Sequence, residues 1–447
     1  MSQRQSHIRL GGFLSGAGSH FAGWRHPSAD RDAAFNIQRY VNYAQTLERG
    51  CFDVLFLNDN FELGDLDAKG FSRNTHTSRW DPMTLLTALA MVTTHIGLVA
   101  TVNTSYNEPF NVARRFASLD QLSSGRTGWN LVTSLGGGEN FNRTDHLPHQ
   151  ERYARAEEFF DVVTKLWDSW DDNAFLRDPV SGQWVDPAKL HLAQHQGVHF
   201  SVRGPLNTPR PPQGWPVIAQ AGSSGEGLAL AARAGELIFT AQQTLPAAQA
   251  FYRKLKDQAI TLGRSADDVL ILPGVATVVG HSRAEAEEKY EELQALLDPV
   301  MVFSSIIDFL DLGVDLTSLP LDAKVPLPKN PPLTQGHQSR QQLVIDLIQR
   351  DRPTVRELLR KLASGGHRTL VGTASDIADD FEHWFQNYGA DGFNIMFTHL
   401  PTAADDFVNL VVPELQRRGL LRTAYEGKTL RDHLGLKRVE NKWGLIN

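Results

Sequence analysis

A turn rich in glycine and serine is the part of the sequence best suited to bind an anion. Gln220–Ala234 reads QAGSSGEGLALAARA, so Gly222, Ser223 and Ser224 stand where a buried run ends and a helical pattern begins. Small residues there leave backbone N–H groups available at a helix N-terminus, which favours a phosphate. The alternative is structural, since Ser223 or Ser224 could simply cap the helix.

A histidine and a tyrosine four residues apart could serve the same ligand. His149 and Tyr153 stand at the entry to a helical pattern over Arg152–Trp170. Side chains four residues apart share one face of a helix, and an imidazole and a phenol can each donate a hydrogen bond to a phosphate oxygen. Packing of Tyr153 at an interface is the alternative.

Polar side chains also interrupt or follow several strand-like runs. Asp59 follows the apolar run FDVLFL, where a carboxylate is a candidate for function or for an Asx turn. Thr101 and Asn103 lie in or at the end of the third such run, and Asn130 and Thr133 lie in the fourth. Buried polar groups need partners, so we expect these side chains to converge at one end of the sheet.

Three histidines with metal-like spacing are better explained without a metal. His191, His195 and His199 are four residues apart, but Gly197 argues against a single helical face, and no H-E-x-x-H pattern is present. We expect these histidines to be solvated or hydrogen-bonded locally, and we predict no metal site.

Eight short runs rich in apolar and β-branched residues must position these side chains. Segments with apolar spacing near 3.6 lie between most of them, including Ile37–Arg49 and Leu245–Leu262. Eight strands that alternate with helices predict a parallel sheet, and eight is the number that closes a (β/α) barrel. The predicted strands are His7–Leu14, Phe52–Leu57, Ile96–Val102, Thr127–Thr133, Pro216–Gln220, Glu236–Thr240, Val269–Val279 and Gly392–Phe397.

We predict an α/β fold, a TIM (β/α)8 barrel that forms a single domain over residues 1–447. An open, doubly wound sheet shows the same alternation, but Phe21 and Phe141 stand where a G-x-G-x-x-G dinucleotide fingerprint needs its third glycine. Long insertions lie at the C-terminal face of the barrel, where active sites form. They span about 61–82, 135–150, 171–215 with a small hairpin, and 281–367 with helical patterns at Arg283–Leu297 and Arg340–Leu362.

The composition argues against several classes of function. The chain has 44 basic and 51 acidic residues, a net charge of −7, and no basic run of the kind that binds nucleic acid. Its single cysteine, Cys51, can form neither an intramolecular disulfide nor a zinc site by itself. Met1–Leu10 lacks the order of a secretory signal, and no stretch is long and apolar enough to span a bilayer. We expect a cytoplasmic protein that binds neither nucleic acid nor membranes.

Gly125–Ser134, which reads GRTGWNLVTS, resembles the signature of the bacterial-luciferase-like flavin monooxygenases. The match is to the subfamily of nitrilotriacetate, dibenzothiophene-sulfone and long-chain-alkane monooxygenases. Little of this resemblance extends into 281–367. Further motifs of the subfamily follow in order along the rest of the chain: Trp24–Pro27, Phe52–Asp59, Glu151–Phe159, Gly204–Pro211, Gln220–Ser224, Asp391–Asn394 and Val411–Gly419.

The resemblance implies a two-component, FMN-dependent monooxygenase. A separate flavin reductase would supply reduced FMN, and O2 would be the co-substrate. Reduced FMN and O2 form a flavin C4a-(hydro)peroxide, which inserts one oxygen atom into a small organic substrate. The positions that match the family's flavin-binding residues are Asp59, Thr101 and Asn130 for the ring and ribityl chain, and His149, Tyr153, Ser223 and Ser224 for the phosphate.

Three residues are candidates for contact with the substrate or the flavin peroxide. His20 and His26 follow the first strand, and Tyr106 follows the third. A histidine can act as an acid or base near neutral pH, although His26 within the WRHP motif could be structural.

Two other functions on the same fold stay open, namely deazaflavin-dependent hydride transfer and flavin binding without catalysis. The GWNLVTS signature favours FMN over the deazaflavin. We expect a homodimer or a higher homo-oligomer. The sequence does not identify the substrate, because the insertions shape the pocket.

Overall fold

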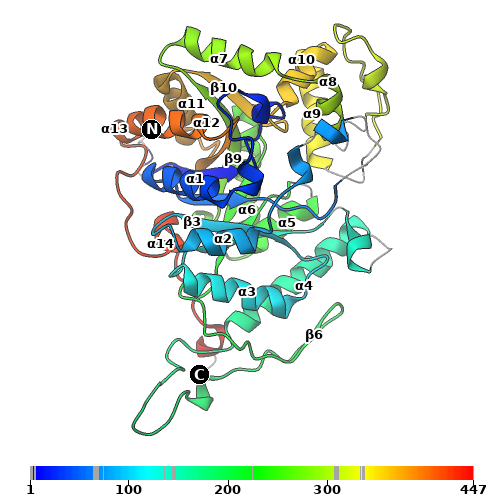
Figure 1. Cartoon of the computed structure of the whole chain (residues 1–447). Coiled ribbons are helices and arrows are strands. Elements are labelled where there is room, and N and C mark those ends of the chain that lie inside the picture. Colours follow the sequence, from blue (N-terminus) through cyan, green and yellow to red (C-terminus); the bar gives the residue numbers. More distant parts are fainter. Residues whose placement is uncertain are drawn as a thin grey trace.

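Eight parallel strands close into a barrel in the computed structural model of the chain, and helices surround it (Figure 1). The structure describes residues 4, 7–63, 70–73, 75–134, 136–142, 147–223, 225–306, 312–332, 334 and 338–445. All eight predicted strands are present, so the predicted TIM barrel is confirmed and the open sheet is wrong. The barrel strands are β1 (Arg9–Leu14), β2 (Val54–Leu57), β3 (Gly97–Asn103), β4 (Thr127–Val132), β7 (Val217–Gln220), β8 (Leu237–Thr240), β9 (Leu270–Val279) and β11 (Gly392–Phe397).

The long strand β9 closes the barrel and carries one additional strand. On one side it pairs with β11, and on the other its first half pairs with β8, from Leu237↔Leu270 to Thr240↔Pro273. Beyond the end of β8, the second half of β9 pairs instead with β10 (Arg368–Gly372). Strand β10 therefore continues the line of β8 past the end of the barrel. It is not among the strands predicted from the sequence.

The helices begin at polar caps that precede apolar periodic segments. The side chain of Asn36 accepts a hydrogen bond from the N–H of Gln38 at the start of α1, and Asp81 accepts one from Thr84 at the start of α2. The helices around the barrel are α1 (Ile37–Arg49), α2 (Pro82–Ala90), α3 (Pro109–Leu122), α4 (His149–Trp167), α5 (Gly225–Ala234), α6 (Leu245–Thr261), α11 (Ala374–Gln386), α12 (Thr402–Asp406) and α13 (Val412–Arg417). Among the described helices, none is long and apolar enough to cross a bilayer.

The insertion over 281–367 forms its own helical cluster beside the barrel. It contains α7 (Arg283–Ala295), α8 (Pro299–Ile306), α9 (Gln338–Asp351) and α10 (Val355–Leu362), and Figure 1 shows α8, α9 and α10 close together. Phe21, in the loop after β1, belongs to the apolar core of this cluster, together with residues such as Val302 and Leu358. The insertion therefore packs onto the C-terminal side of the barrel.

The prediction of one continuous helix over Arg340–Leu362 is wrong. Arg352 has a φ of 45°, and Pro353 lacks the N–H group that a helix interior needs. Thr354 then starts α10 with a capping box, in which its side chain and that of Glu357 bond each other's backbone N–H groups. The helical spacing of apolar residues continues across this break, so the spacing alone does not reveal that there are two helices.

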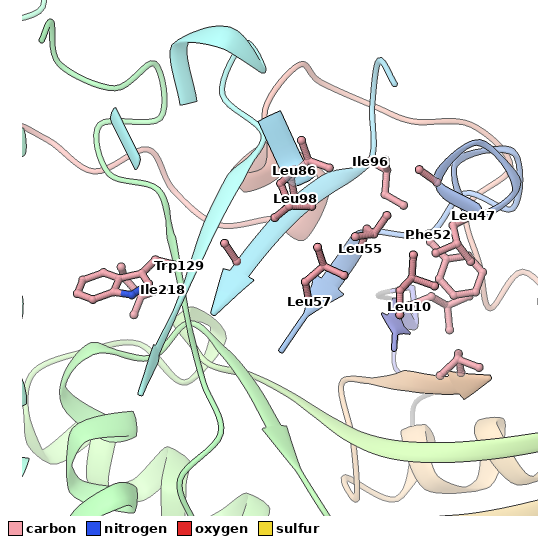
Figure 2. Packing of buried hydrophobic residues seen from close by; sticks show 14 of the residues in the cluster. Leu10, Leu47, Phe52, Leu55, Leu57, Leu86, Ile96, Leu98, Trp129 and Ile218 are labelled. Atoms are coloured by element: carbon pink, nitrogen blue, oxygen red, sulfur yellow. The ribbon is translucent and has the colours of Figure 1, made fainter. Parts of the chain in front are cut away.

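Two apolar layers lie on the two faces of the barrel wall. Outside the wall, strand residues such as Leu10, Leu55 and Leu98 pack with Leu47 of α1 and Leu86 of α2 (Figure 2). The luminal layer contains Phe13, Phe56, Phe239 and Met396, and α14 (Leu430–Leu434) contributes Leu430 and Leu434 to it. Leu430 lies against Gly97 and Gly128, near the N-terminal ends of β3 and β4, so α14 fills the bottom of the barrel.

The predicted hairpin of the third insertion consists of β5 (His195–Gln196) and β6 (Ser201–Val202). His195 Nε2 lies 2.9 Å from Glu158 Oε1, and His191 Nε2 lies 2.9 Å from Asp171 Oδ1. The backbone N–H of His199 donates to Glu158. These contacts confirm that the rings of His191 and His195 are hydrogen-bonded to carboxylates, whereas His199 contacts Glu158 through its backbone.

Candidate functional site

The predicted polar residues of β3 and β4 meet inside the barrel. Thr101 and Asn130 are direct partners in the register of the two strands, and Asn130 Nδ2 donates to Thr101 Oγ1 over 2.9 Å. Both side chains are buried, yet Asn130 Oδ1 accepts no hydrogen bond from the described residues. A buried carbonyl oxygen without a donor costs free energy, so this atom is suited to accept a hydrogen bond from a ligand.

Asp59 lies two residues beyond the end of β2, and its Oδ1 accepts a hydrogen bond from the N–H of Asn60. Burial raises the pKa of Asp59 to about 6, an effect that the neighbouring Arg79 opposes and Asp81 reinforces. The carboxyl group can therefore carry or release a proton close to neutral pH. No sequence signal singles out Arg79 as a neighbour of Asp59.

A pocket lies beside Asp59 at the C-terminal ends of β1 and β2. Its lining includes Ser15 after β1, Asn58 after β2, Tyr40 of α1, and Arg79 and Trp80 of the first insertion. The insertion after β2 thus lines the open C-terminal end of the barrel, its mouth, which is where TIM barrels form their active sites.

The predicted phosphate residues of α4 and of the turn after β7 lie close together. The rings of His149 and Tyr153, in the first turns of α4, are 4.9 Å apart between centroids. His149 Nδ1 lies 3.5 Å from Glu226 Oε2 in α5, and a side-chain carbon at Gly222 would lie 3.1 Å from Tyr153 Oη. The hydroxyl of Tyr153 therefore lies close to the backbone of this turn, where any residue larger than glycine at position 222 would crowd it.

Ser223 lies at the same turn, and its Oγ is 3.3 Å from Thr240 Oγ1 at the end of β8. Its side chain thus contacts the neighbouring strand. Ser224 lies outside the described residues. The helix α5 begins at Gly225, where the backbone amides of its first turn have no helical acceptor. The donor set of Tyr153, His149, Ser223 and this helix start fits a phosphate group.

His20 and His26 both lie near a third histidine, His399, which follows β11. The rings of His26 and His399 stack at 4.1 Å, and His20 Nδ1 accepts a hydrogen bond from the N–H of Ala22. Burial lowers the pKa of His20 and of His399 to about 3, and it also lowers the pKa of His26. His399 is not among the residues predicted from the sequence, although its position two residues beyond a barrel strand is a usable signal.

Tyr106 belongs to an aromatic cluster built from three loops of the C-terminal face. Its ring stacks on that of Phe141 at 5.0 Å, and Phe61 lies 4.9 Å from Phe141 and 6.5 Å from Tyr106. These residues follow β3, β4 and β2, so they cover one side of the barrel mouth. The structure does not place Tyr106 beside His20 or His26 in any contact that it describes.

Comparisons with known proteins identify the family of the chain. The family described as "Luciferase-like monooxygenase" matches residues 17–392. Nitrilotriacetate monooxygenase component A of Aminobacter aminovorans is 48% identical over 444 residues, which cover 97% of this chain and 97% of that protein. N-acetyl-S-(2-succino)cysteine monooxygenase of Bacillus subtilis (strain 168) is 46% identical over 447 residues, which cover 99% and 100%.

Solved structures of similar fold also match the chain. A riboflavin lyase, crystallised with modified FMN and riboflavin, superposes with a TM-score of 0.85 at 31% identity, over 97% of each chain. Together with the motifs that begin at Gly125–Ser134, these matches show that the chain belongs to the luciferase-like monooxygenase family.

Proposed function

We propose that this chain is the oxygenase component of a two-component monooxygenase, which uses reduced FMN and O2 to insert one oxygen atom into a small organic substrate. The observation that carries the proposal is the buried Asn130 Oδ1, which accepts no hydrogen bond from the described residues. A ring N–H or a ribityl hydroxyl would satisfy this acceptor. Thr101 holds the amide of Asn130 in the orientation that leaves Oδ1 available.

Tyr153, His149 and Ser223 would hold the phosphate, together with Ser224 and the first backbone amides of α5. Each of these groups can donate a hydrogen bond to a phosphate oxygen, and hydrogen bonds to a charged acceptor are the stronger kind. The helix start adds a favourable dipole. His149 Nδ1 lies 3.5 Å from Glu226 Oε2, so the ring would donate to Glu226 and to the phosphate at the same time only with a proton on each nitrogen.

Bound reduced FMN would supply the activation of O2. The chain's own residues would orient the ring and keep water away from it, through Asp59, Thr101 and Asn130 on one side and the cluster of Tyr106, Phe61 and Phe141 over the mouth. Asp59 would take up and release a proton at a pH slightly below neutral, because burial raises its pKa to about 6. His20 and His26 would act as neutral hydrogen-bonding groups, since burial keeps their pKa values low.

A separate reductase is part of the proposal. The relative from Aminobacter aminovorans is named as component A of its enzyme, and such a name implies at least one further component. Uncharged donors and a helix start would hold the phosphate loosely enough for reduced FMN to exchange between the two proteins. The substrates named for the two relatives, nitrilotriacetate and N-acetyl-S-(2-succino)cysteine, are the first compounds to test.

The test combines the purified chain, any NADH-dependent FMN reductase and 18O2. We expect product that carries one labelled oxygen atom, and none when FMN or the chain is omitted. Substrate oxidation that proceeds without O2 would support hydride transfer instead. Tight FMN binding without turnover of any compound would support a binding protein that has lost catalysis.

A further inference from the structure

Arg340 is a cationic side chain whose charge the described residues do not balance. It lies in the first turn of α9, within the large insertion. Its Nη1 donates to the carbonyl oxygen of Gly365 over 3.0 Å, and its Nη2 donates to His367 Nε2 over 2.8 Å. Both acceptors are neutral, because burial and the charge of Arg340 hold the pKa of His367 well below its usual range.

The contacts of His367 place Arg340 at the mouth of the barrel. The ring of His367 stacks on Phe239 at 5.1 Å, and Phe239 contacts Phe13 and Phe56 in the luminal layer. A side-chain carbon at Gly274 of β9 would lie 2.3 Å from His367 Nδ1, so the imidazole sits directly against the barrel wall.

The segment that carries Arg340's partners is fixed to the loop after β8. Gln243 Nε2 donates to the carbonyl oxygen of Gly366 over 2.7 Å. In the same loop, Gln242 Nε2 donates to Thr240 Oγ1, which contacts Ser223 of the phosphate turn. Arg340 thus lies on the side of the mouth next to the turn that would bind FMN. Its own hydrogen-bond partners, Gly365 and His367, are not part of that turn.

Four buried arginines, Arg126, Arg210, Arg422 and Arg431, have more partners among the described residues than Arg340 does, or pair with a carboxylate. Arg210, Arg422 and Arg431 each pair with a carboxylate, and Arg126 makes five hydrogen bonds from its guanidinium. Arg340 makes two hydrogen bonds and no ion pair with the described residues. Burial lowers its pKa to about 10, so the side chain keeps its charge at neutral pH. A partly buried guanidinium with free donors is suited to an external anion.

We propose that Arg340 binds a carboxylate group of the organic substrate at the mouth of the barrel. The proposal rests on the proposed monooxygenase function, because it assumes that the substrate enters there. A planar guanidinium can hold a carboxylate through two parallel hydrogen bonds, which gives direction as well as affinity. His367 is a positioning residue, since its neutral Nε2 holds Nη2 of Arg340 in place.

The test measures binding and needs no turnover, so it can fail independently of the oxygenase assay. Calorimetry in the presence of FMN would compare succinate and tricarballylate with their methyl esters, for the wild-type protein and for Arg340→Gln, Arg340→Lys and Arg350→Gln. Arg350 is the matched control, because it lies at the other end of α9 and pairs with Asp351. We expect the wild type to prefer at least one acid over its ester by about tenfold or more.

Arg340→Gln should abolish this preference without changing the affinity for the ester. Arg340→Lys should retain part of the preference, and Arg350→Gln all of it. A wild-type protein that prefers no acid over its ester would overturn the proposal. So would an Arg340→Gln protein that keeps the preference, or one that loses FMN affinity but not riboflavin affinity, because the arginine would then serve the phosphate.

Discussion

Asn130 donates its amide N–H to Thr101 across the β3–β4 pair and leaves its own carbonyl oxygen buried without a donor. We predict that Asn130→Ala weakens FMN binding by about tenfold, because it removes the acceptor that the flavin would use. Quenching of FMN fluorescence on titration with protein measures this change. Thr101→Val removes the hydrogen bond to Asn130 but keeps the carbonyl acceptor of Asn130, and we expect it to weaken binding less. Unchanged affinity in Asn130→Ala would remove Asn130 from the site.

The proposed phosphate cradle, formed by Tyr153, His149, Ser223 and the start of α5, predicts a difference between FMN and riboflavin. In Tyr153→Phe and Ser223→Ala, we expect each substitution to cost about 1.5–3 kcal/mol of FMN binding, since each removes a hydrogen bond to a charged acceptor. Binding of riboflavin, which has no phosphate, should stay constant. Equal losses for both flavins would show that these residues support the fold and not the phosphate.

Gly222 predicts a steric effect at the same turn. A methyl group there would lie 2.9 Å from the Gly227 Cα and 3.1 Å from Tyr153 Oη, so Gly222→Ala must displace the turn or the tyrosine. We expect FMN affinity to fall by about tenfold or more. Gly225→Ala is the control, because a side-chain carbon at that glycine meets no atom of the described residues within 4 Å, apart from its chain neighbours and its own helix backbone. If the two variants bind FMN equally well, the turn does not form the cradle.

The raised pKa of Asp59 predicts a pH-dependent stability. Asp59 has a pKa of about 6 in the folded chain, whereas the ordinary pKa of an aspartate is 3.8. Between these two pH values the folded state binds more protons than the unfolded state, so the contribution of Asp59 to stability falls as the pH rises. Asp59→Asn should therefore stabilise the protein at pH 7 by as much as about 3 kcal/mol, and by much less at pH 4. Thermal unfolding at the two pH values measures this, and an equal effect at both would contradict it.

The barrel could be predicted from sequence because each wall strand is a short apolar run bounded by turns. Polar interruptions such as Thr101 and Asn130 were visible for the same reason, since a polar residue stands out in a buried run. The strand β10 was not visible, because Arg368–Gly372 is only partly buried over most of its length and its pairing depends on how far β9 extends. Periodicity also failed at Pro353, where two helices share one apolar spacing.

Contacts between distant segments could not be predicted either. His399 and His26 are far apart in sequence, and only the closure of β11 against β1 brings their rings together. Arg340 and His367 lie in the insertion with little resemblance to the family, and nothing in their local sequence shows that they reach the barrel mouth. Such pairs are set by tertiary packing, which a single sequence does not encode in its local pattern.

The ten residues of β9 extend well past the last residue of β8, and β10 pairs with the part of β9 that β8 does not reach. A barrel strand that is longer than its neighbour provides a place where an inserted segment can pair with the sheet. The segment between β9 and β10 can change in length and sequence while the pairing below it keeps its register. Side chains of the insertion, such as that of Arg340, can therefore reach the end of the barrel while the pairing of the eight barrel strands stays intact.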